Sequence, residues 1–499
     1  MNRVQLLSTL RRVEWIAWVL FLVALPVTSF PYFPPTFGGG TLVRPLSIYP
    51  LLILLVIATL PRLFTQPLPK ATLSLVPFAL VAVASSVISL LRDIEPALGI
   101  SVIERVARAV ITLGVGGAIY LTVVLFPRTP DDLKASLRWI YTGMGLAMLV
   151  GSLQVFYIVH FTPAWFNLMN NFQKFFSTRR LINNRISGLT YEPNWFAEQI
   201  TFLLLPWLLS SVLNGYSVFK WRWHKVTVEL ILLLWAIGLL PFTYSRAGVL
   251  NLVGLAFVGA FFFRYRPTRE SSDLDDTTQA RRRRWARRLL EAGLAIALIF
   301  GAIFVAGSRN EFFSRLWSYW LTKSNPTIGG YLKYLGFGAR FTYSETAFNT
   351  YNAFPVMGVG LGNYAFFFDE MLPERPINLT PEVLRLITPE EGRNRLITAK
   401  NFYLRLLAET GLVGTAAFFA FLIAVCGCAL YLWLSPDRER SFWGTAGLLG
   451  ILAFALSAFS FDSLALPNMW VILGLTTAAA SIYQNMGPEA PKEGCTKML

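Results

Sequence analysis

The residues that could do chemistry lie in polar segments of a strongly apolar chain, in which charged residues make up only 14%. Lys400 precedes a predicted short helix that begins at Asn401 and stops before Gly411. The N-terminus of a helix favours a nearby anion and disfavours a protonated amine. The glycines of segment 336–363 permit tight turns and close approach of a ligand to the backbone. By itself this glycine pattern is a weak sign of phosphate binding, because no strand–helix context surrounds it.

Two further polar segments precede this region. Arg246 lies in Thr243–Gly248, which joins two apolar segments with almost no loop. An arginine held at a membrane surface is costly unless it snorkels to the headgroups or has a partner, and both interpretations stay open. The other segment, Arg185–Asn194, leads into an apolar segment, with Pro193 suited to the first turn of a helix and Glu192 near its positive end.

Histidine and cysteine offer little for a metal site. The chain has two histidines and three cysteines. His160, at the end of an apolar segment, is a weak candidate for the same outer region. Cys426 and Cys428 lie in an apolar run, where packing is the simpler explanation. We expect no metal, no cofactor and no disulfide framework.

The composition predicts an all-α polytopic membrane protein. Hydrophobic residues make up 55% of the 499 residues and the mean hydropathy is +0.52, which suits a surface solvated by lipid. Apolar windows of spanning length predict about 12 transmembrane helices. They lie near 15–28, 46–61, 73–91, 106–126, 137–160, 195–213, 226–243, 247–263, 289–306, 411–433, 442–459 and 469–483. The first window lacks a small-residue cleavage site, so we expect it to stay attached.

Lys and Arg set the predicted orientation. With the N-terminus in the cytoplasm, 24 of the 44 fall in cytoplasmic segments and only five in short outer loops. Short loops carry the topological signal, so both termini are predicted to be cytoplasmic. The membrane domain then spans 1–486 and includes a large helical periplasmic loop, 307–410, between helices 9 and 10.

Two polar cytoplasmic segments complete the predicted organisation. The loop 264–288 is basic and contains four consecutive arginines from Arg281. One interpretation is a binding site for anionic membrane lipids or for a partner. The other, which we favour, is a stop signal that fixes the next helix in the membrane. The tail 487–499 is polar. The net charge of +16 follows largely from this topology, so no nucleic-acid partner is expected.

The order of these motifs resembles the O-antigen ligase and O-antigen polymerase superfamily over most of the chain, roughly from the apolar window at 137–160 to the one at 469–483. The matching segments are Arg185–Asn194, Ser245–Arg246, Pro355–Asn363, Asn401–Gly414 and Pro467–Trp470. The resemblance implies a metal-independent glycosyltransferase in the bacterial inner membrane, with its active site facing the periplasm. Its donor would be a glycan on undecaprenyl pyrophosphate. Its acceptor would be a second glycan for a polymerase or lipid A–core for a ligase, and a chain-length regulator is a candidate partner.

The resemblance also implies roles for individual residues. Arg246 and Arg340 would bind the donor pyrophosphate and stabilise the charge of the leaving group. Further substrate contacts are expected from Arg185, Asn194, Tyr244, Asn363 and Asn401.

One departure from the family pattern favours a polymerase of O-antigen, capsule or exopolysaccharide over a ligase. Ligases of the family typically have His-Asn where this chain has Lys400–Asn401. Nearby cations and a helix N-terminus would make Lys400 a candidate general base, whereas bound pyrophosphate would make it a third phosphate cation. We favour the cation, with Glu192 as the backup base.

Two other classes compete with the enzyme. Twelve helices are common in secondary transporters of polysaccharides or lipids, and a membrane scaffold is a weaker alternative. The largest loop does not lie at the midpoint of the chain, and the ionisable residues gather at the outer surface and not at the membrane midplane. Both features disfavour a transporter.

Overall fold

The computed structural model describes residues 3–32, 43–265, 311–373, 383–384, 387–388 and 396–486. The predicted window 289–306 and the tail 487–499 lie outside these residues. So do nearly all of the basic loop 264–288 and parts of the large loop 307–410.

The described chain is almost entirely helical. In its first half the helices are α1 (Arg3–Val23), α2 (Ile48–Leu54), η2 (Leu55–Thr59), α3 (Leu60–Thr65), α4 (Lys70–Leu73), α5 (Leu75–Ser89), α6 (Val102–Leu125), α7 (Pro130–Val159), α8 (Pro163–Gln173), α9 (Pro193–Glu198), η3 (Gln199–Leu204) and α10 (Leu205–Asn214). After a two-stranded ribbon of β1 (Arg222–Trp223) and β2 (Val226–Thr227) follow α11 (Val228–Leu239), η4 (Leu240–Thr243), α12 (Arg246–Tyr265), α14 (Glu311–Thr322), α15 (Ile328–Tyr334), α16 (Gly338–Ala353), α17 (Tyr364–Phe367), α19 (Phe402–Trp433), α20 (Arg438–Ser457) and α21 (Pro467–Asn485).

Seven described helices or helix runs are long and apolar enough to cross a membrane. They are Ile48–Thr65, Lys70–Ser89, Val102–Leu125, Pro130–Val159, Pro193–Asn214, Phe402–Trp433 and Arg438–Ser457. Val228–Thr243 and Arg246–Ala260 are shorter apolar helices. The all-α membrane class is thereby confirmed, while the number of about 12 spans stays a prediction.

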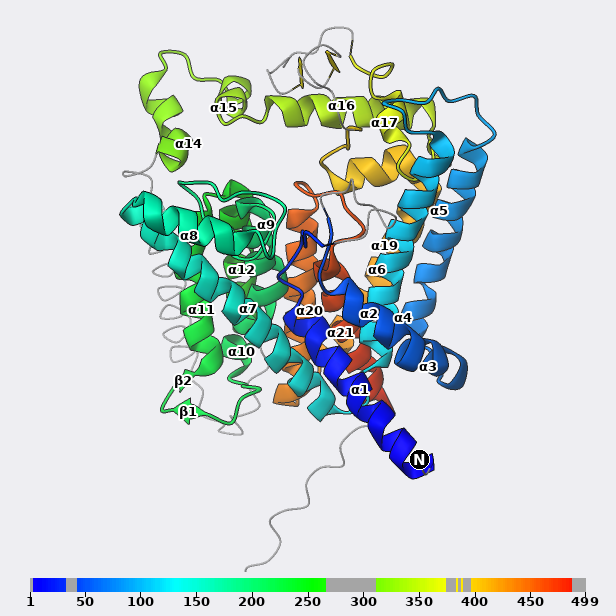
Figure 1. Ribbon diagram of the computed structural model, residues 1–499, viewed down its shortest axis with the longest axis vertical. Coiled ribbons are helices and arrows are strands. Elements are labelled where there is room, and N and C mark those ends of the chain that lie inside the picture. Colours follow the sequence, from blue (N-terminus) through cyan, green and yellow to red (C-terminus); the bar gives the residue numbers. More distant parts are fainter. Residues whose placement is uncertain are drawn as a thin grey trace, which may run out of the picture.

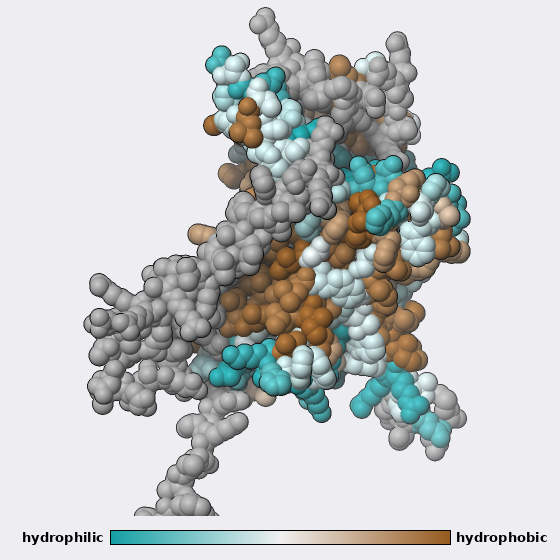
Figure 2. Space-filling model, turned by 90° about the vertical axis from the view of Figure 1, so that its left-hand side faces the viewer, coloured by the Kyte–Doolittle hydropathy of each residue, from teal (hydrophilic) through white to brown (hydrophobic). Residues whose placement is uncertain are grey.

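The molecule has two distinct ends (Figure 1). We call the end that carries α14 to α17 the loop end, and the end at which the N-terminus lies the tail end. Helices α5, α6, α7, α19, α20 and α21 run between them. On the face shown in Figure 2, apolar side chains gather in the middle and polar side chains lie above and below them. Which end faces the cytoplasm stays a prediction.

Small residues allow the helices to approach closely, as is common in membrane bundles. A Cβ at Gly116 of α6 would lie 2.4 Å from the Trp470 ring of α21, and one at Gly474 of α21 would lie 2.8 Å from Val123. Helix α21 also packs against α20, and α19 packs against both α20 and α5. The resulting core fixes the loop-end termini of α19, α20 and α21 relative to one another.

Candidate active site

Arg185 joins two of the polar segments identified from the sequence. Its Nε donates to the Thr243 carbonyl at 2.8 Å, and its Nη2 donates to Oδ1 of Asn194 at 2.8 Å. Nη2 also lies 3.5 Å from the carbonyl oxygen of Tyr244. The segment before α9 and the turn before α12 are therefore held together by one guanidinium group.

The loop that presents Arg185 is anchored by buried amide groups. In α7, Oε1 of Gln154 accepts from the backbone amides of Ser187 and Gly188 at 2.8 and 2.9 Å, and its Nε2 donates to the Gly188 carbonyl at 3.1 Å. Gly188 has φ +54°, and a Cβ there would lie 2.7 Å from the Phe196 ring. A glycine is therefore required at this turn, and the loop is preorganised before any substrate binds.

Several cations gather around Arg185. Burial lowers its pKa below the usual arginine value, and nearby Arg179 and Arg246 lower it further, while Glu192 opposes them. An anion bound here would relieve that mutual repulsion. The sequence reasoning did not single out Arg179, which is paired with Glu192 at 2.6 Å and lies over the Tyr191 ring.

Glu192 and Pro193 begin α9 as the sequence predicts. Glu192 is the residue preceding the helix and Pro193 occupies its first turn. The ion pair with Arg179 engages the Glu192 carboxylate. Because this pair already occupies the carboxylate, less of it is available to a substrate hydroxyl, which weakens the case for Glu192 as the backup base.

Arg246 links the membrane helices to the large loop. It begins α12, two residues after Tyr244, which is buried and has a left-handed backbone with φ 48°. Its Nη1 donates to the carbonyl of Leu335, which follows α15. The sequence left open whether Arg246 snorkels to the headgroups or has a partner, and in the structure it has a protein partner. Arg340 lies in the first turn of α16, shortly after Leu335, and is half-buried.

Asn401 and Gly411 delimit the short helix predicted from the sequence. Oδ1 of Asn401 accepts from the backbone amides of Tyr403 and Leu404 at 3.0 and 3.2 Å, so the predicted N-cap is confirmed. Gly411, with φ 63° and ψ −167°, interrupts the helical backbone inside α19. The predicted stop is also confirmed, because the second part of α19 continues as a separate membrane helix.

Lys400 has an exposed side chain and a left-handed backbone with φ 54°. Its backbone amide donates to Oδ2 of Asp462 at 2.8 Å. A left-handed conformation costs a residue with a Cβ roughly 1–2 kcal/mol. The contact with Asp462, in the connection between α20 and α21, offsets part of that cost and fixes the chain just before α19. The sequence reasoning missed Asp462.

The glycine-rich segment packs against the protein itself. Gly358, Gly360 and Gly362 all have positive φ. A Cβ at Gly358 would lie 2.5 Å from the backbone of Glu409, and one at Gly360 would lie 2.6 Å from the Ser89 hydroxyl. The close approach that Gly358 and Gly360 permit is therefore to α19 and α5, and Gly362 lies against Ala109 and Arg105 of α6. The expectation of close approach to a ligand is not met at these positions.

Asn363 is built into the same packing. Its side chain is fully buried, and Nδ2 donates to the Ser89 hydroxyl at 2.8 Å and to the Val359 carbonyl at 3.1 Å. These contacts place Asn363 in a structural interface, away from any surface that a glycan could reach. The expected substrate contact through Asn363 is therefore not supported.

Two arginines that the sequence reasoning did not select secure this segment, and a third forms an ion pair within α19. Nη1 of Arg92 donates to the Gly358 carbonyl at 3.1 Å, and Nε of Arg105 donates to the Gly362 carbonyl at 2.9 Å. Arg405 pairs with Glu409 at 3.0 Å. Because α16 packs against α19, these contacts fix the position of the large loop on the membrane helices.

The predicted site residues thus form two groups at the loop end. Arg185 is connected by hydrogen bonds to Asn194 and Tyr244, and Arg246 lies close enough to lower the pKa of Arg185. Lys400 and Asn401 form a second group at the start of α19. Helix α16, which carries Arg340, runs along the loop end between α15 and α17 (Figure 1). His160 is exposed beyond the end of α7, and we find no contact from it to either group among the described residues.

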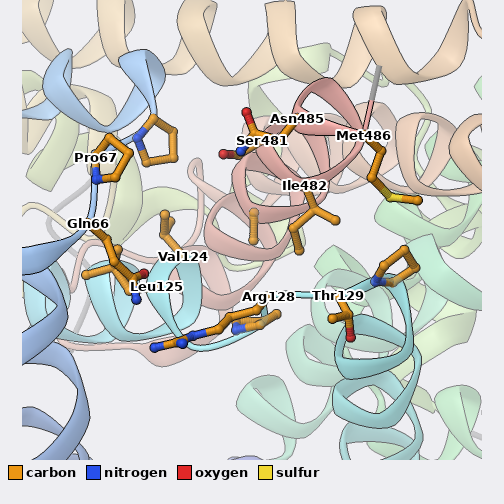
Figure 3. Close-up of a pocket in the computed structure, with 14 residues that line it drawn as sticks. Gln66, Pro67, Val124, Leu125, Arg128, Thr129, Ser481, Ile482, Asn485 and Met486 are labelled. Atoms are coloured by element: carbon orange, nitrogen blue, oxygen red, sulfur yellow. The ribbon is translucent and has the colours of Figure 1, made fainter. Parts of the chain in front are cut away.

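A cavity of about 560 Å³ lies at the opposite, tail end. It is lined by the α3–α4 and α6–α7 connections and by the last turns of α21 (Figure 3). Among the described residues that line it, Arg128 is the one cation, and none of the predicted site residues is found there. Within the described ranges no group of three His, Cys, Asp or Glu could hold a metal ion.

Comparison with known proteins identifies a family domain. Residues 231–419 match the family model described as O-antigen ligase. This range includes Arg246, Arg340, Lys400 and Asn401 and leaves out the Arg185–Asn194 segment. No match was found among curated proteins. The match over residues 231–419 confirms the resemblance to the O-antigen ligase and polymerase superfamily for that part of the chain, and together with the apolar helices it indicates a multi-pass membrane protein.

Proposed function

We propose that this chain polymerises oligosaccharide repeat units that are linked to undecaprenyl pyrophosphate, on the periplasmic side of a bacterial inner membrane. The observation that carries the proposal is the cation group at the loop end. Arg185 is fixed by Thr243 and Asn194, and Arg246 is fixed by Leu335. These arginines meet where the membrane helices end, which is where the pyrophosphate of a lipid-linked donor would lie.

The proposed reaction forms one glycosidic bond and breaks one phosphate ester bond. A hydroxyl oxygen of the acceptor sugar attacks the anomeric carbon of the donor. The bond from that carbon to the pyrophosphate oxygen breaks, and lipid pyrophosphate leaves with the electron pair. Arginines placed beforehand stabilise the charge that develops on the leaving group, and they accelerate the reaction only insofar as they bind that charge better than the ground state.

Arg340 and Lys400 complete the proposed donor site from the large loop. Arg340 follows the Leu335 turn that binds Arg246. Lys400, whose exposed side chain precedes the N-terminus of α19, serves as a further phosphate cation. In this arrangement, binding of pyrophosphate draws the large loop and the membrane helices onto one ligand.

Transfer to lipid A–core is the second candidate, because the matching family model is described as O-antigen ligase. One experiment separates the two. The purified protein in liposomes is incubated with a defined undecaprenyl-pyrophosphate oligosaccharide, with and without lipid A–core. A ladder of longer glycans without core is the result expected of a polymerase. Product that forms only with core would establish a ligase, and no new glycosidic bond in either arm would contradict both.

A further inference from the structure

Glu198 is a half-buried residue whose carboxyl group the proposed donor site does not use. It is the last residue of α9, and Asn468, in the first turn of α21, lies against its carboxyl group. Within the described part of the chain, its Oε1 is buried and receives no hydrogen bond. Oδ1 of Asn468 is likewise buried and has no donor there. Buried acceptor atoms in native proteins are nearly always paired, so these two call for a ligand that donates hydrogen bonds.

Glu198 lies on the same short helix as Asn194, the residue through which α9 contacts the cation group. Asn194 and Glu198 are four residues apart and so lie on the same face of the helix. Asn194 accepts a hydrogen bond from Arg185 at 2.8 Å. The Glu198 carboxyl group therefore lies one helical turn below the residue that holds Arg185, on the membrane side of the proposed pyrophosphate site.

The surroundings of Glu198 are rigid. A Cβ at Gly248 of α12 would lie 2.8 Å from Ala197, so α9 and α12 are in close contact. The π-helix η3 begins directly after Glu198 and packs against α21. Below it, Nδ2 of Asn251 donates to the Ser457 hydroxyl at 2.7 Å. Short π-helical insertions of this kind are frequent at functional sites.

The other candidate bases are less suitable. Arg179 engages the Glu192 carboxylate at 2.6 Å. His160 is exposed at the end of α7, and Lys400 serves as a cation in the proposed site. Glu198, in contrast, has a carboxyl oxygen that receives no hydrogen bond from the described residues, and it lies one helical turn from Asn194, which contacts Arg185.

We propose that Glu198 is the catalytic base, which accepts the proton of the acceptor hydroxyl as that oxygen attacks the anomeric carbon. This inference rests on the proposed glycosyl transfer. The bond between oxygen and the anomeric carbon forms and the bond from that carbon to pyrophosphate breaks. The O–H proton passes to Oε1 of Glu198 and then to water, while lipid pyrophosphate carries away the electron pair. Asn468 helps to orient the acceptor sugar beside the carboxyl group.

The test compares Glu198→Gln with wild-type protein in liposomes that contain the lipid-linked donor. Glutamine keeps the shape of the side chain but does not accept a proton at neutral pH. General base catalysis typically contributes about 10²- to 10⁴-fold, so kcat should fall by roughly that factor. The KM for donor should stay within about threefold of wild type, because the arginines are intact. Glu104→Gln is the matched control: Glu104 is an exposed surface residue paired with Arg108 and should leave kcat unchanged.

The outcomes are distinguishable. If wild-type protein forms no glycosidic bond, the proposed function fails. If wild type and Glu198→Gln have kcat values within about threefold of each other, only the role of Glu198 fails. Glu198→Asp provides a second test should the glutamine variant not fold. It keeps a carboxyl group but shortens its reach, so kcat should fall while donor KM changes little, and unchanged kcat would overturn the proposal.

Discussion

Replacement of Arg185 by lysine tests whether the geometry of the guanidinium group, beyond its charge, builds the donor site. Arg185 donates through Nε to Thr243 and through Nη2 to Asn194, both at 2.8 Å. An ammonium group keeps the charge but cannot reproduce this fork. Losing one hydrogen bond from a charged group costs about 1.5–3 kcal/mol. At roughly 1.4 kcal/mol per factor of ten, kcat/KM for the donor should fall about 10- to 150-fold.

The assay is glycan chain growth from a lipid-linked oligosaccharide in liposomes, with initial rates measured over a range of donor concentrations. Arg180→Lys is the matched control, because Arg180 lies in the same loop with an exposed side chain. A double-mutant cycle with Asn194→Ala adds a second readout. Since Asn194 and Arg185 share a hydrogen bond, their effects should be non-additive by about 0.5–3 kcal/mol. A value of kcat/KM within twofold of wild type, or additive effects, would refute this account of Arg185.

Three further predictions concern the large loop and α19. Gly358→Ala should lower the thermal unfolding temperature, because its Cβ would meet the Glu409 backbone at 2.5 Å. Gly427→Ala, with open space around it, is the control, and equal stability of the two would contradict this packing. Asn401→Ala should cost about 1 kcal/mol of stability through loss of the N-cap, whereas Asn401→Asp should retain most of it. Equal losses in both variants would exclude capping as the cause. Lys400→Ala should raise the donor KM and Lys400→Arg should restore it, since the proposed role needs a cation; full activity of Lys400→Ala would exclude that role.

Local features of the fold could be predicted from the sequence. Apolar windows predicted the helical membrane class, and residue chemistry predicted the helix boundaries at Pro193, Asn401 and Gly411. Each of these signals acts within a few residues, because capping and backbone strain are local. The pairing of Arg185 with Asn194 also lies within one short segment.

Contacts between distant segments could not be predicted in the same way. The glycine pattern predicts that another group approaches the backbone closely, but it does not identify that group. In the structure the approaching residues are Ser89 and Glu409. Arg92 and Arg105 were not predicted as structural contacts, because from the sequence an arginine near a helix end is explained equally well by membrane topology. Only the structure shows that they donate to carbonyl groups of the glycine-rich segment. Asp462 and Asn468 acquire their importance only when α19, α20 and α21 pack together.

Glycosyl transfer is the central claim, and the release of undecaprenyl pyrophosphate tests it most directly. Purified protein in liposomes should release one lipid pyrophosphate for each new glycosidic bond when it is given a lipid-linked oligosaccharide. Arg246→Ala should abolish both products in parallel, because that arginine is proposed to hold the leaving group. Movement of the glycan across the bilayer without release of lipid pyrophosphate would contradict the account and would identify a transporter.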